Sequence, residues 1–171
     1  RIWELSRMVN GSPEISAAFD EGVDGLHERL DALPAAASFN VAFAGLLSEF
    51  GHRGVNEWEL SAETWQINPS LAYDMINRVR KQDDNSSPAI RSVQSMENRI
   101  AAEAELSALV AGDEATAGIL AAGINSGQTS YRMREAGKNA AVQLFHEPKL
   151  AFRELGRRMH ERGSIADPMD I

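Results

Sequence analysis

The chain has 171 residues and no cysteine, which excludes disulfide bonds and thiolate metal sites and fits a reducing compartment. Its length and its 43% hydrophobic residues suffice for one domain with a hydrophobic core. The net charge of -8 argues against general nucleic-acid binding, which depends on a basic surface. No apolar run approaches the roughly 20 residues that span a bilayer. We therefore expect a cytoplasmic protein that binds neither nucleic acid nor membrane.

We expect residues 1–171 to form a single helical domain. The chain does not begin with Met, and it stops shortly after the turn signal Asp167-Pro168. These ends predict that it is a fragment of a longer multidomain protein. Its charge is uneven, because segment 131–162 carries eight Lys and Arg against four Glu, although such a run is ordinarily a solvated helix face.

Two amphipathic helices are predicted in the first third of the chain. Apolar residues recur at steps of three and four over residues 13–33, the periodicity of one helical face. Ser12 suits the N-cap, and Pro13 suits the first helical position because its missing N–H costs nothing there. The next segment, residues 39–50, is the most apolar helix and is predicted to stop at Gly51.

Two later helix starts repeat the pattern of a capping residue before proline. Asn68 precedes Pro69, and Ser87 precedes Pro88 after a short polar linker. Asp113 is predicted to cap the helix that follows these two.

The last third of the chain is predicted to contain several short helices. The first ends at Ile124 and the second covers residues 133–145. Pro148 either kinks this second helix or begins a new one, which is expected to stop at Gly163. With seven or eight helical segments and no alternating strand pattern, the predicted fold class is all-α, an antiparallel multi-helix bundle.

Ionisable and aromatic side chains are concentrated in the connection between residues 51 and 69. It opens with Gly-His-Arg-Gly at residues 51–54, and the two glycines let the backbone pass close to another surface. Glu57 and Glu59 are placed to hold Arg53 in a hydrogen-bonded ion pair. Such costly residues between helices indicate where an interaction should be sought.

Two interpretations of this connection stay open at the level of sequence. In the first it braces the fold, with Glu57, Trp58 and Trp65 pinning it to the core. In the second a substrate contacts it together with an apolar concavity from the neighbouring helices. The residues proposed for substrate binding are Phe39, Phe43, Leu46, Leu47, His52, Arg53 and Met75.

No complete catalytic site is predicted, and no catalytic residue is assigned. None of the four histidines has a second ligand at metal-binding spacing, so no metal site is expected. His27 and His160 are interpreted as surface groups, and His146 as a partner of a helix C-terminus. A glycine-rich phosphate loop and a nucleophilic serine elbow are both absent from the sequence.

Two motifs carry a resemblance to a known family. The first comprises Gly51-His52-Arg53-Gly54, Glu57, Leu60-Ser61, Trp65 and Asn68-Pro69. The second comprises Arg134-Glu135-Ala136-Gly137-Lys138-Asn139, Arg153-Glu154-Leu155-Gly156-Arg157-Arg158, Gly163-Ser164-Ile165, Asp167-Pro168 and Asp170. In this order they resemble the helical central region of rifampicin phosphotransferase and related enzymes like phosphoenolpyruvate synthase.

The resemblance implies a modular parent that transfers a phosphoryl group from ATP. In such enzymes an ATP-grasp domain and a swivelling phosphohistidine domain act together with the helical region. The chain carries neither the phosphohistidine motif nor the family's ATP-binding residues, so it is expected to be inactive alone. No cofactor is expected in this chain, whereas ATP and Mg²⁺ are implied for the parent.

The leading hypothesis is therefore a helical acceptor-binding or spacer domain of an ATP-dependent, phosphoenolpyruvate-utilising phosphotransferase similar to rifampicin phosphotransferase. Its expected partners are the ATP-grasp and phosphohistidine domains of the parent, and a hydrophobic small-molecule acceptor. The alternative is a non-catalytic interaction module whose basic C-terminal segment docks an acidic partner domain.

Overall fold

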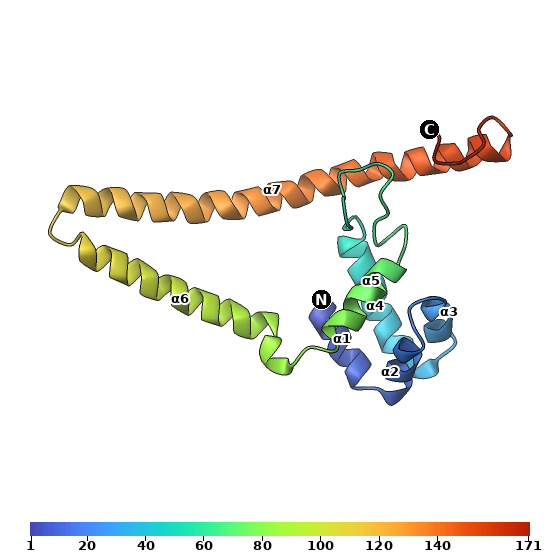
Figure 1. Cartoon of the computed structure of the whole chain (residues 1–171), viewed down its shortest axis with the longest axis horizontal. Helices are drawn as coiled ribbons and strands as arrows, with labels where there is room; N and C mark the ends of the chain where they lie inside the picture. Colours follow the sequence, from blue (N-terminus) through green and yellow to red (C-terminus); the bar gives the residue numbers. More distant parts are fainter. The chain divides into compact units, whose positions relative to one another are not determined.

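The structure, a computed structural model, describes residues 1–171 and contains seven α-helices, two short 3₁₀-helices and no strand (Figure 1). The predicted all-α class and the number of helices are confirmed. The chain divides into two compact units, which we call unit 1 and unit 2. Unit 1 combines residues 1–81 with residues 140–171, and unit 2 covers residues 82–139.

Unit 1 contains five complete helices, one 3₁₀-helix and the second half of the last helix. They are α1 (Ile2–Asn10), α2 (Pro13–Asp20), α3 (Leu26–Asp31), η1 (Pro34–Ala36), α4 (Ala37–Phe50), α5 (Ser70–Val79) and the part of α7 (Glu114–Glu161) from Ala140 onward. Helix α1 packs against α2, α4 and α5. The predicted helix over residues 39–50 is confirmed as α4.

The prediction of one helix over residues 13–33 is wrong, because the segment forms two helices, α2 and α3. Gly22 and Gly25 between them have φ values of 103° and 64°, a conformation that ends an α-helix. The predicted cap before α2 is confirmed, since the Ser12 side chain accepts a hydrogen bond from the N–H of Ile15 at 3.3 Å.

Four aromatic rings form the centre of the unit 1 core. Phe43 stacks on Tyr73 with 4.1 Å between ring centroids, and Phe19 meets Phe39 edge-on at 5.8 Å. All four side chains are buried, and leucines, isoleucines and valines of α1 to α5 complete the cluster. The most apolar predicted helix, α4, therefore supplies the core rather than a surface.

The end of α5 is anchored to α1 and α2 by arginine side chains. Arg7 donates to the carbonyl of Val79 at 3.1 Å, and Asn10 donates to the carbonyl of Arg80 at 2.8 Å. Arg80 in turn donates to Ser16 at 3.0 Å and forms an ion pair with Asp20. These bonds satisfy carbonyls at the helix C-terminus and fix the position of α5.

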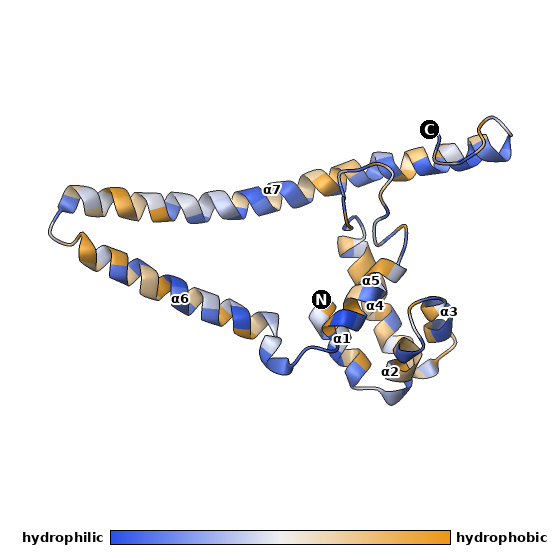
Figure 2. Ribbon diagram, in the orientation of Figure 1, coloured by the Kyte–Doolittle hydropathy of each residue, from blue (hydrophilic) through white to orange (hydrophobic).

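Unit 2 is a helical hairpin of α6 (Pro88–Leu109) and the first part of α7, preceded by η2 (Asp84–Ser86). The predicted cap at Asp113 is confirmed, because its side chain accepts hydrogen bonds from the N–H groups of Ala115 and Thr116. Helix α6 buries no residue, and hydrophobic and hydrophilic positions alternate along it (Figure 2).

The prediction of separate helices after residue 113 is wrong, because α7 is one helix of 48 residues that continues through Pro148. An internal proline removes a single hydrogen bond, and internal glycines cost only about 1 kcal/mol each, so neither has to end a helix. The helix ends where predicted, since Gly163 has φ 71° and its N–H donates to the carbonyl of His160 at 2.8 Å. No helix, α7 included, combines the length and the hydropathy needed to cross a membrane.

Candidate functional site

Residues 51–69, which we call the 51–69 loop, leave α4 and return to the start of α5. Two backbone hydrogen bonds close the base of this loop. The N–H of Gln66 donates to the carbonyl of Gly51 at 2.9 Å, and the N–H of Trp65 donates to the carbonyl of Arg53 at 2.8 Å. The Asn68 side chain then accepts from the N–H of Ser70, the first residue of α5, at 3.1 Å.

The glycines at both ends of residues 51–54 are required by this closure. A Cβ atom on Gly51 would lie 2.9 Å from the Cβ of Gln66, and a Cβ on Gly54 would lie 2.6 Å from the carbonyl oxygen of Glu63. Both separations are shorter than real Cβ contacts, so the two arms of the loop pair closely only because these side chains are absent. As expected from the two glycines, the backbone passes close to another surface, which is the opposite arm of the same loop.

The tip of the loop is held by one face of α7 (Figure 1). Lys149 is 1% exposed, and its ammonium group donates to the carbonyl of Ala62 at 3.1 Å and to that of Glu57 at 3.4 Å. Arg153 donates to the carbonyl of Ser61 at 2.6 Å. Burial lowers the pKa of Lys149, the expected cost of removing an ammonium group from water.

His146 extends the same face of α7 toward the base of the loop. Its Nε2 donates to the side-chain oxygen of Gln66 at 3.2 Å, whereas its Nδ1 is buried without a partner. The interpretation of His146 as a partner of a helix C-terminus is wrong, because α7 continues to Glu161. Burial lowers the pKa of His146, and the nearby Lys149 adds to this effect.

This lowered pKa makes the stability of unit 1 depend on pH. As the pH falls through 6.5, the ordinary pKa of histidine, the unfolded chain binds the proton before the folded chain does. We expect the free energy of unfolding to fall as the pH decreases from 6.5 to the lower pKa of folded His146. Below that pKa both states bind the proton, so His146 lowers the free energy of unfolding no further. His146→Gln should flatten this part of the pH profile, measured by urea unfolding between pH 5 and pH 8.

The exposed His160 on the same helix supplies the control for this experiment. His160→Gln makes the same replacement at an exposed histidine and measures the effect of the substitution itself. If the profile of His146→Gln followed that of the natural chain, protonation of His146 would not be the cause of the pH dependence.

Arg53 is oriented by Glu57, as the first interpretation of the loop predicts. The Nε of Arg53 lies 3.1 Å from a carboxylate oxygen of Glu57, and the Glu57 side chain is only 8% exposed. Trp58 adds a ring contact to Phe145 of α7, with 6.2 Å between centroids. The loop is thus a braced structure whose conformation does not need a ligand to fix it.

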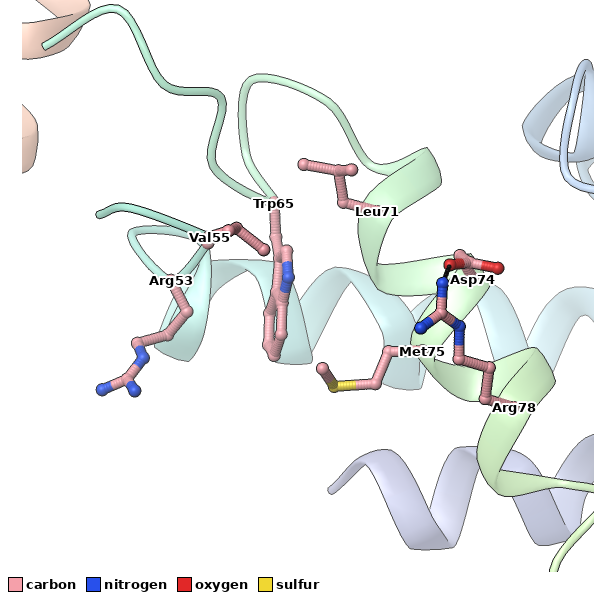
Figure 3. A pocket seen from close by; sticks show the side chains of 8 residues that line it. Arg53, Val55, Trp65, Leu71, Asp74, Met75 and Arg78 are labelled. Carbon is pink, nitrogen blue, oxygen red and sulfur yellow. Dashed lines mark hydrogen bonds and ion pairs between the residues drawn. The ribbon is translucent and has the colours of Figure 1, made fainter. Parts of the chain in front are cut away.

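The braced loop and α5 together form a pocket of about 480 Å³. Arg53, Gly54, Val55 and Trp65 line it from the loop, and Leu71, Asp74, Met75 and Arg78 line it from α5. Trp65 and Met75 lie in the middle, with Arg53 at one end and Arg78 at the other (Figure 3). Arg78 donates to the carboxylate of Asp74 at 2.6 Å. Four apolar or aromatic side chains and three charged ones therefore line the pocket.

Three of the residues singled out from the sequence line this pocket, namely Arg53, Trp65 and Met75. Phe39, Phe43 and Leu46 belong to the core, and Leu47 packs against it. His52 and Glu57 are buried beside the pocket and are not among its lining residues, and Trp58 faces α7.

Sequence reasoning found only Met75 of the α5 wall and missed the α7 brace. Leu71, Asp74, Met75 and Arg78 follow steps of three, one and three, which places them on one face of α5. On α7, His146, Lys149 and Arg153 follow steps of three and four. Both spacings are visible in the sequence, but polar residues on a helix are ordinarily taken for a solvated face.

The basic residues near the C-terminus make contacts within unit 1. Beyond the carbonyl contacts of Lys149 and Arg153, Arg157 and Arg158 both bond to Glu154, at 2.8 Å and 2.7 Å. These bonds lower the pKa of Glu154 to about 2. Part of the excess positive charge of residues 131–162 is therefore neutralised by ion pairs within unit 1.

ATP and Mg²⁺ are the groups that the resemblance implies for the parent protein. No group of three or more His, Cys, Asp or Glu side chains gathers where a metal ion could be held. The sequence has no phosphate-binding glycine loop. We therefore assign neither group a site here.

Comparison with known families gives one result that covers most of the chain. The sequence model described as "Rifampicin phosphotransferase fourth domain" matches residues 1–135. The chain belongs to this family. The resemblance inferred from its motifs is confirmed. No curated protein and no solved structure matches the chain.

The matched part of the chain contains the entire pocket. The first motif, at residues 51–69, lies inside the match, whereas nearly all of the second motif follows residue 135. His146, Lys149 and Arg153 also follow it. The match therefore covers both walls of the pocket and leaves out the side chains of α7 that brace its loop.

Proposed function

We propose that this chain is the acceptor-binding domain of a phosphotransferase that uses ATP, and that the pocket between the 51–69 loop and α5 holds the acceptor. The observation that carries the proposal is the composition of the pocket wall. The loop residues that line one wall belong to the motif that first suggested the family. Lys149 and Arg153 of α7 hold this loop in place by hydrogen bonds to its backbone.

The chemistry of the pocket suits a hydrophobic acceptor that carries a hydroxyl group. Trp65, Leu71 and Met75 offer apolar surface, as in most small-molecule sites. The Asp74 carboxylate can accept a hydrogen bond from a hydroxyl group. The volume of about 480 Å³ lies within the usual range for ligand pockets.

The phosphoryl chemistry itself is assigned to other parts of the parent protein. The partners proposed for this domain are an ATP-grasp domain and a phosphohistidine domain, which supply ATP, Mg²⁺ and the transferred group. The domain described here binds the acceptor and orients it for the transfer. The proposal also places the protein in the cytoplasm.

Binding to the chain of 171 residues tests the proposal directly. We expect at least one member of a panel of rifamycins and other apolar hydroxyl compounds to bind, as measured by calorimetry and by chemical-shift changes. Trp65→Ala should weaken that binding roughly tenfold or more, because truncating a central aromatic side chain removes a binding hot spot.

Trp58→Ala is the matched control, because Trp58 belongs to the same loop but faces α7 rather than the pocket. It should leave the affinity within about twofold. The acceptor-binding proposal would be abandoned if no compound bound, or if Trp65→Ala bound every compound as tightly as the natural chain.

A further inference from the structure

We propose that the pocket selects acceptors that carry an anionic group, and that Arg53 binds this group while the apolar body lies against Trp65. The inference rests on the proposed acceptor-binding function and names the class of acceptor. It concerns amphipathic acids, in which a flat apolar ring system bears a carboxylate, sulfonate or similar oxyanion.

The charged side chains that line the pocket favour an anionic ligand. Two arginines and one aspartate are among its lining residues, so positive side chains outnumber negative ones there although the chain carries a net charge of -8. A cavity with low-dielectric walls concentrates the field of the charges that line it. The pocket therefore favours an anion over a cation although the chain as a whole is acidic.

The two arginines are not equivalent, because their partner carboxylates lie in different places. Asp74, the partner of Arg78, itself lines the pocket, so an anion at that end would meet a negative charge as well. Glu57, the partner of Arg53, does not line the pocket. An anion at the Arg53 end meets the cation with the carboxylate buried away from it.

Solvent exposure separates the two arginines further. The Arg53 side chain is 35% exposed, whereas the Arg78 side chain is 78% exposed. A charged hydrogen bond gains strength as water is removed from around it. The Glu57 pair also fixes the Arg53 guanidinium before binding, which reduces the entropy lost when a ligand arrives.

The position of Trp65 sets the shape of the ligand. Its ring lies beside Val55 and between Arg53 and Met75 (Figure 3). A planar apolar body can stack on this ring while its anionic group reaches the guanidinium of Arg53. At its other end the body meets the Met75 thioether, which adapts to irregular apolar shapes.

Two fluorescent probes with the same ring system test the inference. 8-Anilinonaphthalene-1-sulfonate is anionic, and N-phenyl-1-naphthylamine is its neutral counterpart. Each is titrated into the 171-residue chain, and only the component that Trp65→Ala removes is compared, because exposed apolar residues of α6 also attract such dyes. We expect the anionic probe to bind about tenfold more tightly or better.

Substitution of each arginine assigns the preference. Arg53→Gln should bring the affinity of the anionic probe close to that of the neutral probe and leave the neutral probe unchanged. Arg78→Gln should change either affinity by less than about threefold, because the Asp74 carboxylate lines the pocket beside Arg78 and the Arg78 side chain is 78% exposed. Arg53→Lys keeps the charge and should retain part of the preference.

The outcomes separate this inference from the proposed function. Equal binding of both probes, abolished by Trp65→Ala, would overturn the anion preference and leave the acceptor pocket standing. Binding that Trp65→Ala does not affect would overturn both. A preference lost in Arg78→Gln and kept in Arg53→Gln would overturn the assignment to Arg53.

Salt titration of the natural chain covers the case in which Arg53→Gln does not fold. Raising the ionic strength should weaken the anionic probe and spare the neutral probe. The same slope for both probes would contradict an ionic contact in the pocket.

Discussion

Phe43→Ala is expected to lower the free energy of unfolding by about 3–5 kcal/mol, the cost of truncating a fully buried phenylalanine. Phe43 is 3% exposed, stacks on Tyr73 at 4.1 Å and lies 6.1 Å from the ring of Phe39. The substitution removes a ring from the middle of the aromatic cluster. The surrounding helices are held to one another by that cluster, so they can close the resulting cavity only in part.

Urea unfolding followed by circular dichroism measures this loss. Phe152→Ala is the control, because Phe152 is a similar side chain on α7 that is 46% exposed, and it should cost about 1 kcal/mol or less. If Phe43→Ala kept nearly all of its stability but lost ligand binding, Phe43 would be a pocket residue as the sequence suggested, and the core assignment would fail.

Gly54→Ala is expected to destabilise unit 1 by about 1–3 kcal/mol, since the added methyl group overpacks a site closed by backbone. The new Cβ would lie 2.6 Å from the Glu63 carbonyl oxygen and 3.1 Å from the Thr64 Cα. Backbone cannot rotate away as a flexible side chain can. The two arms of the 51–69 loop would separate, and the pocket would lose the alignment of Arg53 and Trp65.

Gly45→Ala in α4 is the matched control, because nothing lies within 4 Å of its added Cβ. Alanine is the better helix former, so this variant should gain about 0.5–1 kcal/mol. Thermal unfolding measures the change in the free energy of unfolding for both variants. A Gly54→Ala variant as stable as the natural chain would show that the two arms of the loop are not closely paired in solution.

The fold class and most helix starts follow from local rules that the sequence displays. Ser12 and Asp113 cap helices because their side chains accept hydrogen bonds from backbone N–H groups in the first turn. The break between α2 and α3 escapes the periodicity rule, because both helices bury residues such as Phe19 and Leu26 in the same core. The helical spacing of apolar residues therefore continues across the turn between α2 and α3.

The candidate site was only half predictable, for a physical reason. Arg53 and Trp65 stand out by residue type in the loop that holds the glycine pair, and Met75 stands out as an apolar residue of the next helix. Lys149 does not, because an isolated lysine on a helix is ordinarily exposed, and its burial depends on carbonyls presented by a loop far away in the sequence. Contacts of that kind are set by tertiary packing, which local patterns do not encode.

The return of α7 to unit 1 also sets an order of events during synthesis. The side chains of α7 that hold the 51–69 loop bond to residues 80 to 92 positions earlier in the chain. The aromatic core of α2, α4 and α5 is complete before any of them has been translated. At about 5–20 residues per second, ribosomes take on the order of ten seconds to cover that separation. A nascent chain would thus carry a formed core and an unbraced loop, and pocket assembly would be the last step of its folding.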